Sequence, residues 1–297
     1  MTIDPSKVVV VPAARVRPRS WGGFVVANLA LTRFYTVLPL ALLSLGIAVD
    51  AGVEPVRAAV VVAAIACAVA GGYAYNDLRD QRLDRHNRPR RPIVSGRLSE
   101  RYVHHLVYAL FGGALLVALT SRSWRTVVFM TLLIVSSHLY SDSLKSIPGV
   151  KNAFVGLWCG VLPYGAALDV VKAEAVVPAI AILGLFITQK ELFADIYDLD
   201  GDVAAGVRTI PALIGVRGAL VLVGLLNVAS FLFVRLTSAV PAIPGLPAAA
   251  VFVTCVNVVG LLLLSCRITR TTIRAFLEVQ KLFLIGGCVA LFAMLAR

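Results

Sequence analysis

Long apolar stretches, separated by short polar segments, run through most of this chain. Many of them approach the roughly 20 residues that an α-helix needs to cross the hydrocarbon core of a bilayer. Prolines, glycines and charged residues stand between them, where helices end and turns form. The pattern predicts nine membrane-spanning helices, near residues 27–49, 55–75, 103–120, 125–141, 152–169, 173–190, 214–235, 244–266 and 274–295. We therefore expect an all-α fold, a polytopic membrane helix bundle.

Composition narrows the class further. The 297 residues are 59% hydrophobic and 15% charged, whereas soluble domains are roughly 45–50% apolar and about 25% charged. A soluble or disordered protein could not keep so much apolar surface from water. The five cysteines are scattered without a C-x-x-C pair, which argues against zinc, iron–sulfur and disulfide frameworks.

The basic residues between the spans predict an orientation. If the N-terminus is cytoplasmic and each span crosses once, 20 lysines and arginines fall on the cytoplasmic side and six on the other. Because cytoplasmic loops are rich in Lys and Arg, this distribution favours a cytoplasmic N-terminus. It also accounts for the net charge of +12 without a nucleic-acid partner. The arginine- and alanine-rich composition favours a bacterial inner membrane.

The same pattern predicts the domain organisation. Residues 1–25 carry four basic residues but no apolar core long enough for a signal peptide. We expect them to form a cytoplasmic tail, and residues 26–297 to form a single transmembrane domain.

Acidic residues are scarce, and half of them lie in two short segments. Of the sixteen Asp and Glu residues, three lie between positions 76 and 84 and five between positions 191 and 202. Each segment contains the spacing D-x-x-D-x-x-x-D, with Asp77, Asp80 and Asp84 in the first and Asp195, Asp198 and Asp202 in the second. These offsets place each trio on one face of a helix end. Four predicted spans separate the segments, so both faces are expected to open on the same, cytoplasmic side.

Six carboxylates that face one another require cations, since they could not all ionise unaided. Magnesium is the expected ion because it takes oxygen ligands and is commonly shared between carboxylates and phosphate oxygens. Two such clusters indicate a diphosphate site, where the metal neutralises charge on the departing diphosphate. The expected metal ligands are Asn76, Asp80, Asp84, Asp195, Asp198 and Asp202, and all six aspartates, including Asp77, are expected to serve catalysis.

The two acidic segments resemble the motifs of a known family. The first reads N-D-L-R-D-Q-R-L-D from Asn76 and continues as N-R-P-R-R-P-I-V-S-G to Gly96. The second reads D-I-Y-D-L-D-G-D from Asp195 and is followed by G-V-R-T-I-P, ending at Pro211. Together they resemble the UbiA superfamily of intramembrane prenyltransferases, near the branch of chlorophyll, homogentisate and archaeal ether-lipid prenyl transferases. One departure is R-F-Y-T from Arg33, where many members have R-P-x-N.

This resemblance implies a nine-helix bundle around a central cavity that opens sideways to lipid, with a cytoplasmic cap over two Mg²⁺ ions. It also implies a polyprenyl diphosphate donor, ionised to an allylic carbocation that an aromatic or lipid acceptor captures. The family uses a tyrosine near the cavity and a lysine on the diphosphate after the fourth span. The expected substrate-binding residues are Asn76, Arg33, Arg91, Tyr140, Lys145 and Lys151.

Ordinary structural roles remain open for some of these residues. Lys145 and Lys151 would also serve as inner-face anchors, and Arg33 would also extend its charge toward the membrane surface. For Arg91 the phosphate role is favoured, because a guanidinium forms bidentate contacts with phosphate oxygens.

Three other functions share parts of the pattern. A terpene cyclase of the same superfamily would ionise the same donor and let the donor's own double bonds capture the cation. A phosphoribosyl transferase acting on a lipid phosphate shares the fold and the first motif. A transporter would use intramembrane carboxylates as an ion path, but that predicts acids at mid-span rather than at helix ends.

Overall fold

The computed structural model describes residues 20–237, 258 and 269–295, and within these ranges the chain forms helices and turns without a strand. The α-helices are α1 (Trp21–Leu31), α2 (Phe34–Asp50), α3 (Pro55–Arg79), α4 (Gln81–Asn87), α5 (Glu100–Thr120), α6 (Trp124–Asp142), α7 (Val150–Val161), α8 (Ala173–Ala204), α9 (Ile210–Thr237) and α11 (Arg270–Leu295). Two short 3₁₀ turns, η2 (Leu144–Ser146) and η3 (Leu162–Tyr164), flank α7. The predicted all-α fold is confirmed.

The predicted spans correspond to these helices with one gap. Eight of them overlap described helices, whereas the span 244–266 falls almost entirely outside the described residues. By length and hydropathy, α3, α5, α8 and α9 can each cross a membrane, and the bent pair α1–α2 adds a fifth crossing if it counts as one. The protein is thus an integral multi-pass membrane protein, and the count of nine spans stays a prediction.

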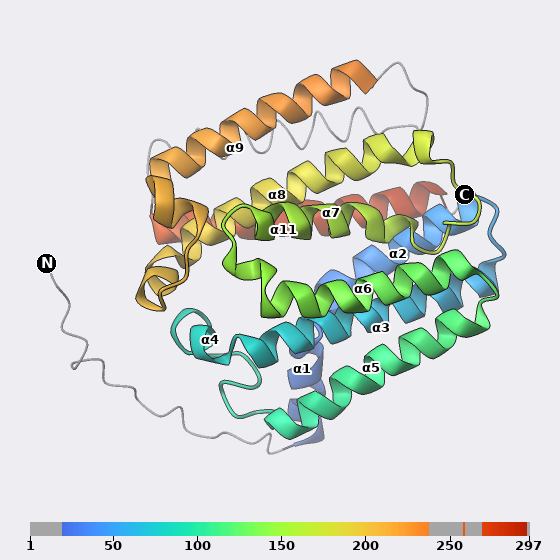
Figure 1. Ribbon diagram of the computed structural model, residues 1–297, viewed down its shortest axis with the longest axis horizontal. Helices are drawn as coiled ribbons and strands as arrows, with labels where there is room; N and C mark the ends of the chain where they lie inside the picture. The colour runs from blue at the N-terminus through green and yellow to red at the C-terminus, as the bar shows by residue number, and fades with distance from the viewer. Residues whose placement is uncertain (1–19, 238–257, 259–268, 296–297) are drawn as a thin grey trace, which may run out of the picture.

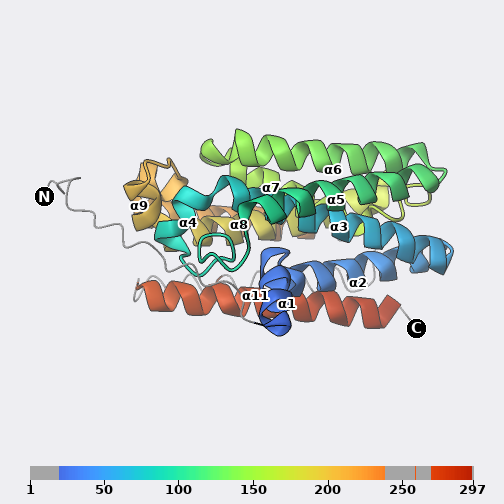
Figure 2. The ribbon, with the colours of Figure 1, turned by 90° about the horizontal axis from the view of Figure 1, so that it is seen from below.

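The first predicted span is not one helix. α1 and α2 meet at an angle of 60°, and Figure 2 shows α1 lying across the neighbouring helices. The break falls at Arg33, whose φ of 49° is left-handed. From this position the Arg33 guanidinium reaches Asp77 on α3 at 3.3 Å and covers the Tyr73 ring at 4.3 Å. Because an unpaired charge is costly among apolar helices, the bend places the guanidinium against an acid and a π face.

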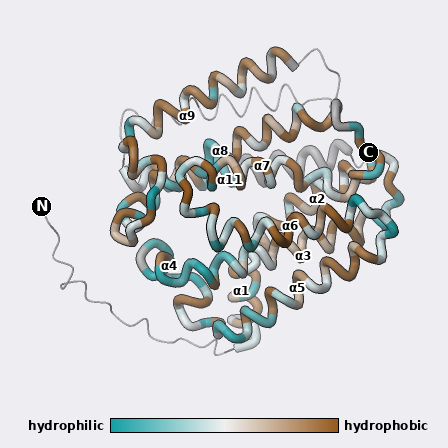
Figure 3. The backbone as a smooth tube through the Cα atoms, viewed as in Figure 1, coloured by the Kyte–Doolittle hydropathy of each residue, from teal (hydrophilic) through white to brown (hydrophobic). Residues whose placement is uncertain are grey.

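Helix contacts close a ring around the middle of the bundle. α3 packs on α2 and α6, η2 joins α6 to α7, α7 packs on α8, and α11 packs on both α8 and α2. α5 and α9 lie outside this ring, on α3 and α8 respectively (Figure 1). Figure 3 shows apolar residues along the length of the helices and hydrophilic residues at both ends, with a large group around α4. We call the end at α4 the polar end.

The tightest packing joins α7 to α8. A Cβ atom at Gly156 would collide with the Gly184 carbonyl and the Thr188 hydroxyl, and one at Gly160 would collide with the Ile180 carbonyl. Glycines of this kind let helix backbones touch directly, as in other membrane bundles. The register between α7 and α8 is fixed as a result, and so is the position of the acids on α8 relative to the start of α7.

Candidate active site

The two aspartate trios come together at the polar end of the bundle, since α4 packs against α8. The second trio follows the prediction, because Asp195, Asp198 and Asp202 all lie on the unbroken helix α8. The first trio does not form one helix end. α3 ends at Arg79, Asp80 stands at the junction, and Asp84 belongs to the short helix α4.

The segment after Asp84 connects the two trios. Asn87 Nδ2 donates to Asp202 Oδ1 at 3.1 Å, and Arg88 Nη2 pairs with Asp198 Oδ2 at 2.5 Å. Arg91 then turns back to the first trio and forms ion pairs with Asp77 and Asp84. Three side chains within five residues therefore hold both acidic faces.

Each trio has one aspartate that pairs with a lysine from outside the two motifs. Lys145 Nζ, in η2, lies 2.5 Å from Asp80 Oδ1. Lys151 Nζ, at the start of α7, lies 2.6 Å from Asp195 Oδ1. The neighbouring Asn152 donates from Nδ2 to the other oxygen of Asp195 at 2.9 Å. Both lysines stand where they could exchange a carboxylate for a diphosphate oxygen.

The remaining predicted site residues, Asn76, Tyr140 and Arg33, lie at the same end of the bundle as the two trios. Asn76 donates from Nδ2 to Asp80 Oδ2 at 2.7 Å, so its amide orients a carboxylate in this structure. Tyr140, near the end of α6, stacks on Phe154 with ring centroids 5.8 Å apart. Asp80 lies within electrostatic reach of Tyr140, and Arg33 reaches Asp77. The structure thus gathers every predicted site residue, while their roles in binding stay predictions.

The loop between α4 and α5 is held firmly over this cluster. Its apolar residues Ile93 and Leu98 are buried in a core cluster shared with α3 and α5. Its backbone closes on itself through Ser95 N to Arg91 O at 2.9 Å, and Gly96 has the positive φ that a turn requires. Arg91 is consequently presented from a fixed loop rather than a free surface segment.

Burial perturbs the acid at the centre of this arrangement. It raises the pKa of Asp84 to about 7, against the opposing effect of Arg88. Asp84 Oδ2 accepts no hydrogen bond, and Arg91 Nη1 lies 3.4 Å from it. A buried carboxyl with a spare oxygen favours either a proton or an additional cation.

The donor set fits magnesium by its chemistry. It offers oxygen ligands alone, as Mg²⁺ prefers, and the spare Oδ2 of Asp84 is one of them. Within the part of the chain that the structure describes, no three His, Cys, Asp or Glu side chains converge closely enough to form a metal site. The aspartates instead engage Arg, Lys and Asn side chains.

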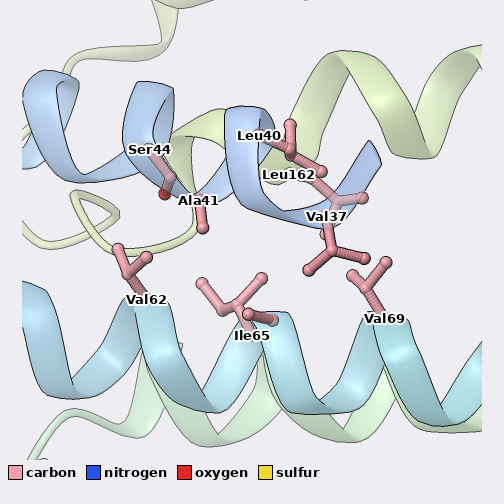
Figure 4. A pocket seen from close by; sticks show the side chains of 9 residues that line it. Val37, Leu40, Ala41, Ser44, Val62, Ile65, Val69 and Leu162 are labelled. Atoms are coloured by element: carbon pink, nitrogen blue, oxygen red, sulfur yellow. The ribbon is translucent and has the colours of Figure 1, made fainter. Parts of the chain in front are cut away.

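A small apolar cavity lies between α2 and α3 (Figure 4). It is lined by Val37, Leu40, Ala41, Ser44, Val62, Ile65, Ala66, Val69 and Leu162. Val69 precedes Asp77 by eight residues on α3, or about 12 Å along a helix. The charged end and the apolar interior are therefore adjacent along one helix.

Sequence reasoning missed three direct partners of the aspartates. Asn87 and Arg88 lie inside the N-R-P stretch but were not among the expected site residues, and Asn152 stands beside Lys151. The signal for the first two was their position between two predicted site residues, Asp84 and Arg91.

The fold and the site together define an integral membrane protein with an all-helical bundle, in which two acidic segments meet at one polar end. The model of the UbiA prenyltransferase family matches residues 37–285, and the chain belongs to this family.

The relatives found in sequence comparison agree with this assignment. Digeranylgeranylglyceryl phosphate synthase from Natronomonas pharaonis is 34% identical over 168 residues, which cover 56% of this chain and 60% of that protein. The enzyme of the same name from Haloquadratum walsbyi is 36% identical over 164 residues, covering 53% and 56%. The matches thus span less than two thirds of these relatives.

The fold matches along nearly the whole chain. A UbiA homologue from Archaeoglobus fulgidus, solved with GPP and Mg²⁺, superposes with a TM-score of 0.68 at 16% identity, covering 90% of this chain and 99% of its own. The apo UbiA homologue from Aeropyrum pernix K1 gives a TM-score of 0.70 at 20% identity, covering 86% and 97%.

Proposed function

We propose that this protein is a Mg²⁺-dependent prenyltransferase that moves a prenyl group from a polyprenyl diphosphate to a lipid acceptor. The observation that carries the proposal is the meeting of the two D-x-x-D-x-x-x-D segments at one end of an apolar bundle, each bound to cationic side chains. A diphosphate bears the charge for the polar end, and a prenyl chain suits the apolar interior. Membership of the UbiA prenyltransferase family supports the same reaction.

The proposed roles follow from the contacts of each residue. Asn76, Asp80, Asp84, Asp195, Asp198 and Asp202 would hold two Mg²⁺ ions, which supply positive charge as the diphosphate departs. Arg91, Lys145 and Lys151, which now bind aspartates, would turn to the diphosphate oxygens. The apolar walls would keep water from the allylic cation until the acceptor captures it.

We favour a glycerol phosphate lipid as the acceptor over an aromatic one. Relatives in several archaea carry the name digeranylgeranylglyceryl phosphate synthase. An acceptor of this kind brings its own apolar tail into the bilayer plane, which suits an enzyme whose bundle lies in lipid.

The site is proposed to face the cytoplasm, in a bacterial inner membrane. The excess of Lys and Arg on that side supports this orientation. Labelling an introduced cysteine at exposed Arg85 in intact cells and in inverted vesicles would test it. A label that enters only in inverted vesicles supports the proposal, and labelling of intact cells contradicts it.

The activity test uses purified protein in detergent with geranyl, farnesyl or geranylgeranyl diphosphate, with Mg²⁺ or EDTA, and with or without a prenylated glycerol phosphate lipid. We expect Mg²⁺-dependent formation of a prenyl ether only when the acceptor is present. A cyclised hydrocarbon formed without acceptor would assign the protein to the terpene cyclases instead. Absence of both products and of diphosphate binding would contradict the proposal.

A further inference from the structure

Each acidic trio has a polar residue one helical turn deeper in the bundle. Glu191 precedes Asp195 by four residues on α8, and Tyr73 precedes Asp77 by four residues on α3. Residues four apart share a helix face. The two sequences 73–77–80–84 and 191–195–198–202 therefore have the same spacing, and Glu191 extends the acidic face of α8 toward the apolar interior.

Glu191 is part of a small polar cluster at this deeper level. Its Oε1 accepts from Lys190 Nζ at 2.9 Å, and a quarter of its side chain remains accessible within the apolar span α8. Among the described residues, nothing donates a hydrogen bond to its second oxygen, Oε2. Tyr73 and Tyr140 both lie within electrostatic reach of Glu191. Since an ionisable residue at this depth is costly, it marks a functional position.

The depth of Glu191 suits the reacting carbon better than the diphosphate. Four residues of helix rise about 6 Å, so Glu191 lies roughly that far below Asp195 along α8. A diphosphate held at the aspartates points its prenyl chain into the apolar interior. Its first carbon then lies between the level of the aspartates and the level of Glu191.

We propose that Glu191 is the catalytic base that takes the proton of the acceptor hydroxyl. This inference rests on the proposed prenyl transfer. The bond between the first prenyl carbon and the bridging oxygen breaks, and its electron pair leaves with the diphosphate. A lone pair of the acceptor oxygen forms the new ether bond to that carbon, and the hydroxyl proton passes to Glu191 Oε2. The products are the ether, free diphosphate and a protonated Glu191.

The aspartates are less suited to this step. Asp195 is bound by Lys151 and Asn152, and Asp198 by Arg88. They also stand at the level where the diphosphate would bind. In the described part of the chain, Glu191 is instead engaged by Lys190 through Oε1 alone, which leaves Oε2 to take the proton.

The experiment separates ionisation of the donor from proton removal. Glu191→Gln is compared with the wild type and with Glu100→Gln, the same change at a side chain that is 59% exposed at the start of α5. One assay follows prenyl transfer to a glycerol phosphate lipid that has a free hydroxyl. The other follows scrambling of a heavy-oxygen label from the bridging position of geranylgeranyl diphosphate, which requires only ionisation and return.

Glu191→Gln is expected to lower transfer about 100-fold or more and to leave scrambling within about twofold, as loss of a general base predicts. Glu191→Asp keeps a carboxylate but withdraws it by one methylene, so transfer should fall about tenfold. This variant carries the test if the glutamine variant does not fold. Glu100→Gln should match the wild type in both assays.

Two results would overturn the inference while leaving the proposed function intact. Full transfer by Glu191→Gln would mean that the proton goes elsewhere, and an equal loss of scrambling and transfer would mean that Glu191 acts on the diphosphate. A wild type that neither scrambles the label nor transfers the prenyl group would instead contradict the proposed function itself.

Discussion

The two acidic segments have the same spacing of aspartates on different backbones. In the second segment, one continuous helix carries Asp195, Asp198 and Asp202. In the first, the helix stops at Arg79 and resumes after Asp80 as the short α4. Because the chain breaks there, α4 turns toward α8, and Asn87 at its end and Arg88 just after it reach the second trio. The same spacing of aspartates thus lies on one continuous helix in the second segment and on two helices joined at Asp80 in the first, which we call the jointed segment.

The partners of the two segments differ in a related way. Lys151 and Asn152 hold Asp195 from α7, a helix locked to α8 by glycine contacts. The first trio is held from distant places, by Arg33 at the α1–α2 bend and by Lys145 in η2. The Lys151–Asp195 pair is also more buried, with 16% and 5% of the side chains exposed against 25% and 18% for Lys145–Asp80.

The largest effect is expected from removing one carboxylate from either segment. Asp80→Asn and Asp198→Asn should each lower Mg²⁺-dependent release of diphosphate about 1,000-fold, because each removes a charge from a shared cation site. Asp50→Asn, at the exposed end of α2, is the matched control. Steady-state assays at saturating donor measure the effect. A loss below tenfold in either aspartate variant would show that the two segments do not act together.

The next effect comes from the contact between the jointed segment and α8. A Cβ atom at Gly201 would collide with the side chain of Asn87, so Gly201→Ala should push the loop away from Asp198 and Asp202. Small displacements of positioning groups cost up to about 100-fold in rate. Gly113→Ala is the control, since its Cβ meets nothing within 4 Å. Equal rates for the two variants would mean that the loop contact is not required for activity.

The two lysines allow a test of the difference in rigidity. Lys151→Met leaves a buried carboxylate unpaired and should reduce the free energy of unfolding by about 3 kcal/mol. Lys145→Met, at the more exposed pair, should cost about 1 kcal/mol. Reversible denaturation in mixed micelles would measure both. Equal losses would show that the two faces are equally fixed.

The smallest effect is expected from exchanging the bridging arginine. Arg88→Lys keeps the charge next to Asp198 but loses the guanidinium fork, which should lower the rate about tenfold. Arg85→Lys, one turn earlier at an exposed position of α4, should change nothing. If both variants behave like the wild type, charge alone rather than geometry connects the two segments.

Much of this arrangement could be predicted from the sequence. Apolar runs of membrane length predict helices because backbone groups in lipid must be satisfied within a helix. Because acids are scarce elsewhere, the sequence predicts a site at Asp77–Asp84 and Asp195–Asp202, and the structure brings these segments together. The sequence also predicts Lys145 and Lys151 as substrate-binding residues, and in the structure each contacts an aspartate.

Other features depend on contacts between distant residues. The break at Arg33 brings its guanidinium to Asp77, 44 residues later, and no local pattern contains that partner. The break between α3 and α4 at Asp80 could not be predicted from the sequence either, because the aspartates around it have the same spacing as those on the unbroken helix α8. Glu191 extends the D-x-x-D-x-x-x-D spacing by one turn, but it was not among the expected site residues, because spacing alone cannot distinguish a metal ligand from a base.

The backbone contact between α7 and α8 has a consequence for how a substrate enters and leaves the bundle. Because the two backbones touch at Gly156 and Gly160 without intervening side chains, we expect α7 and α8 to keep their relative positions during these steps. The part that we expect to move is α1, which meets α2 at 60° at Arg33. Spin labels on α1 and α5 should therefore change their separation on donor binding, while labels on α7 and α8 should not. Because the Arg33 side chain also contacts Asp77, we expect the bend to respond to whether the site beside Asp77 is occupied.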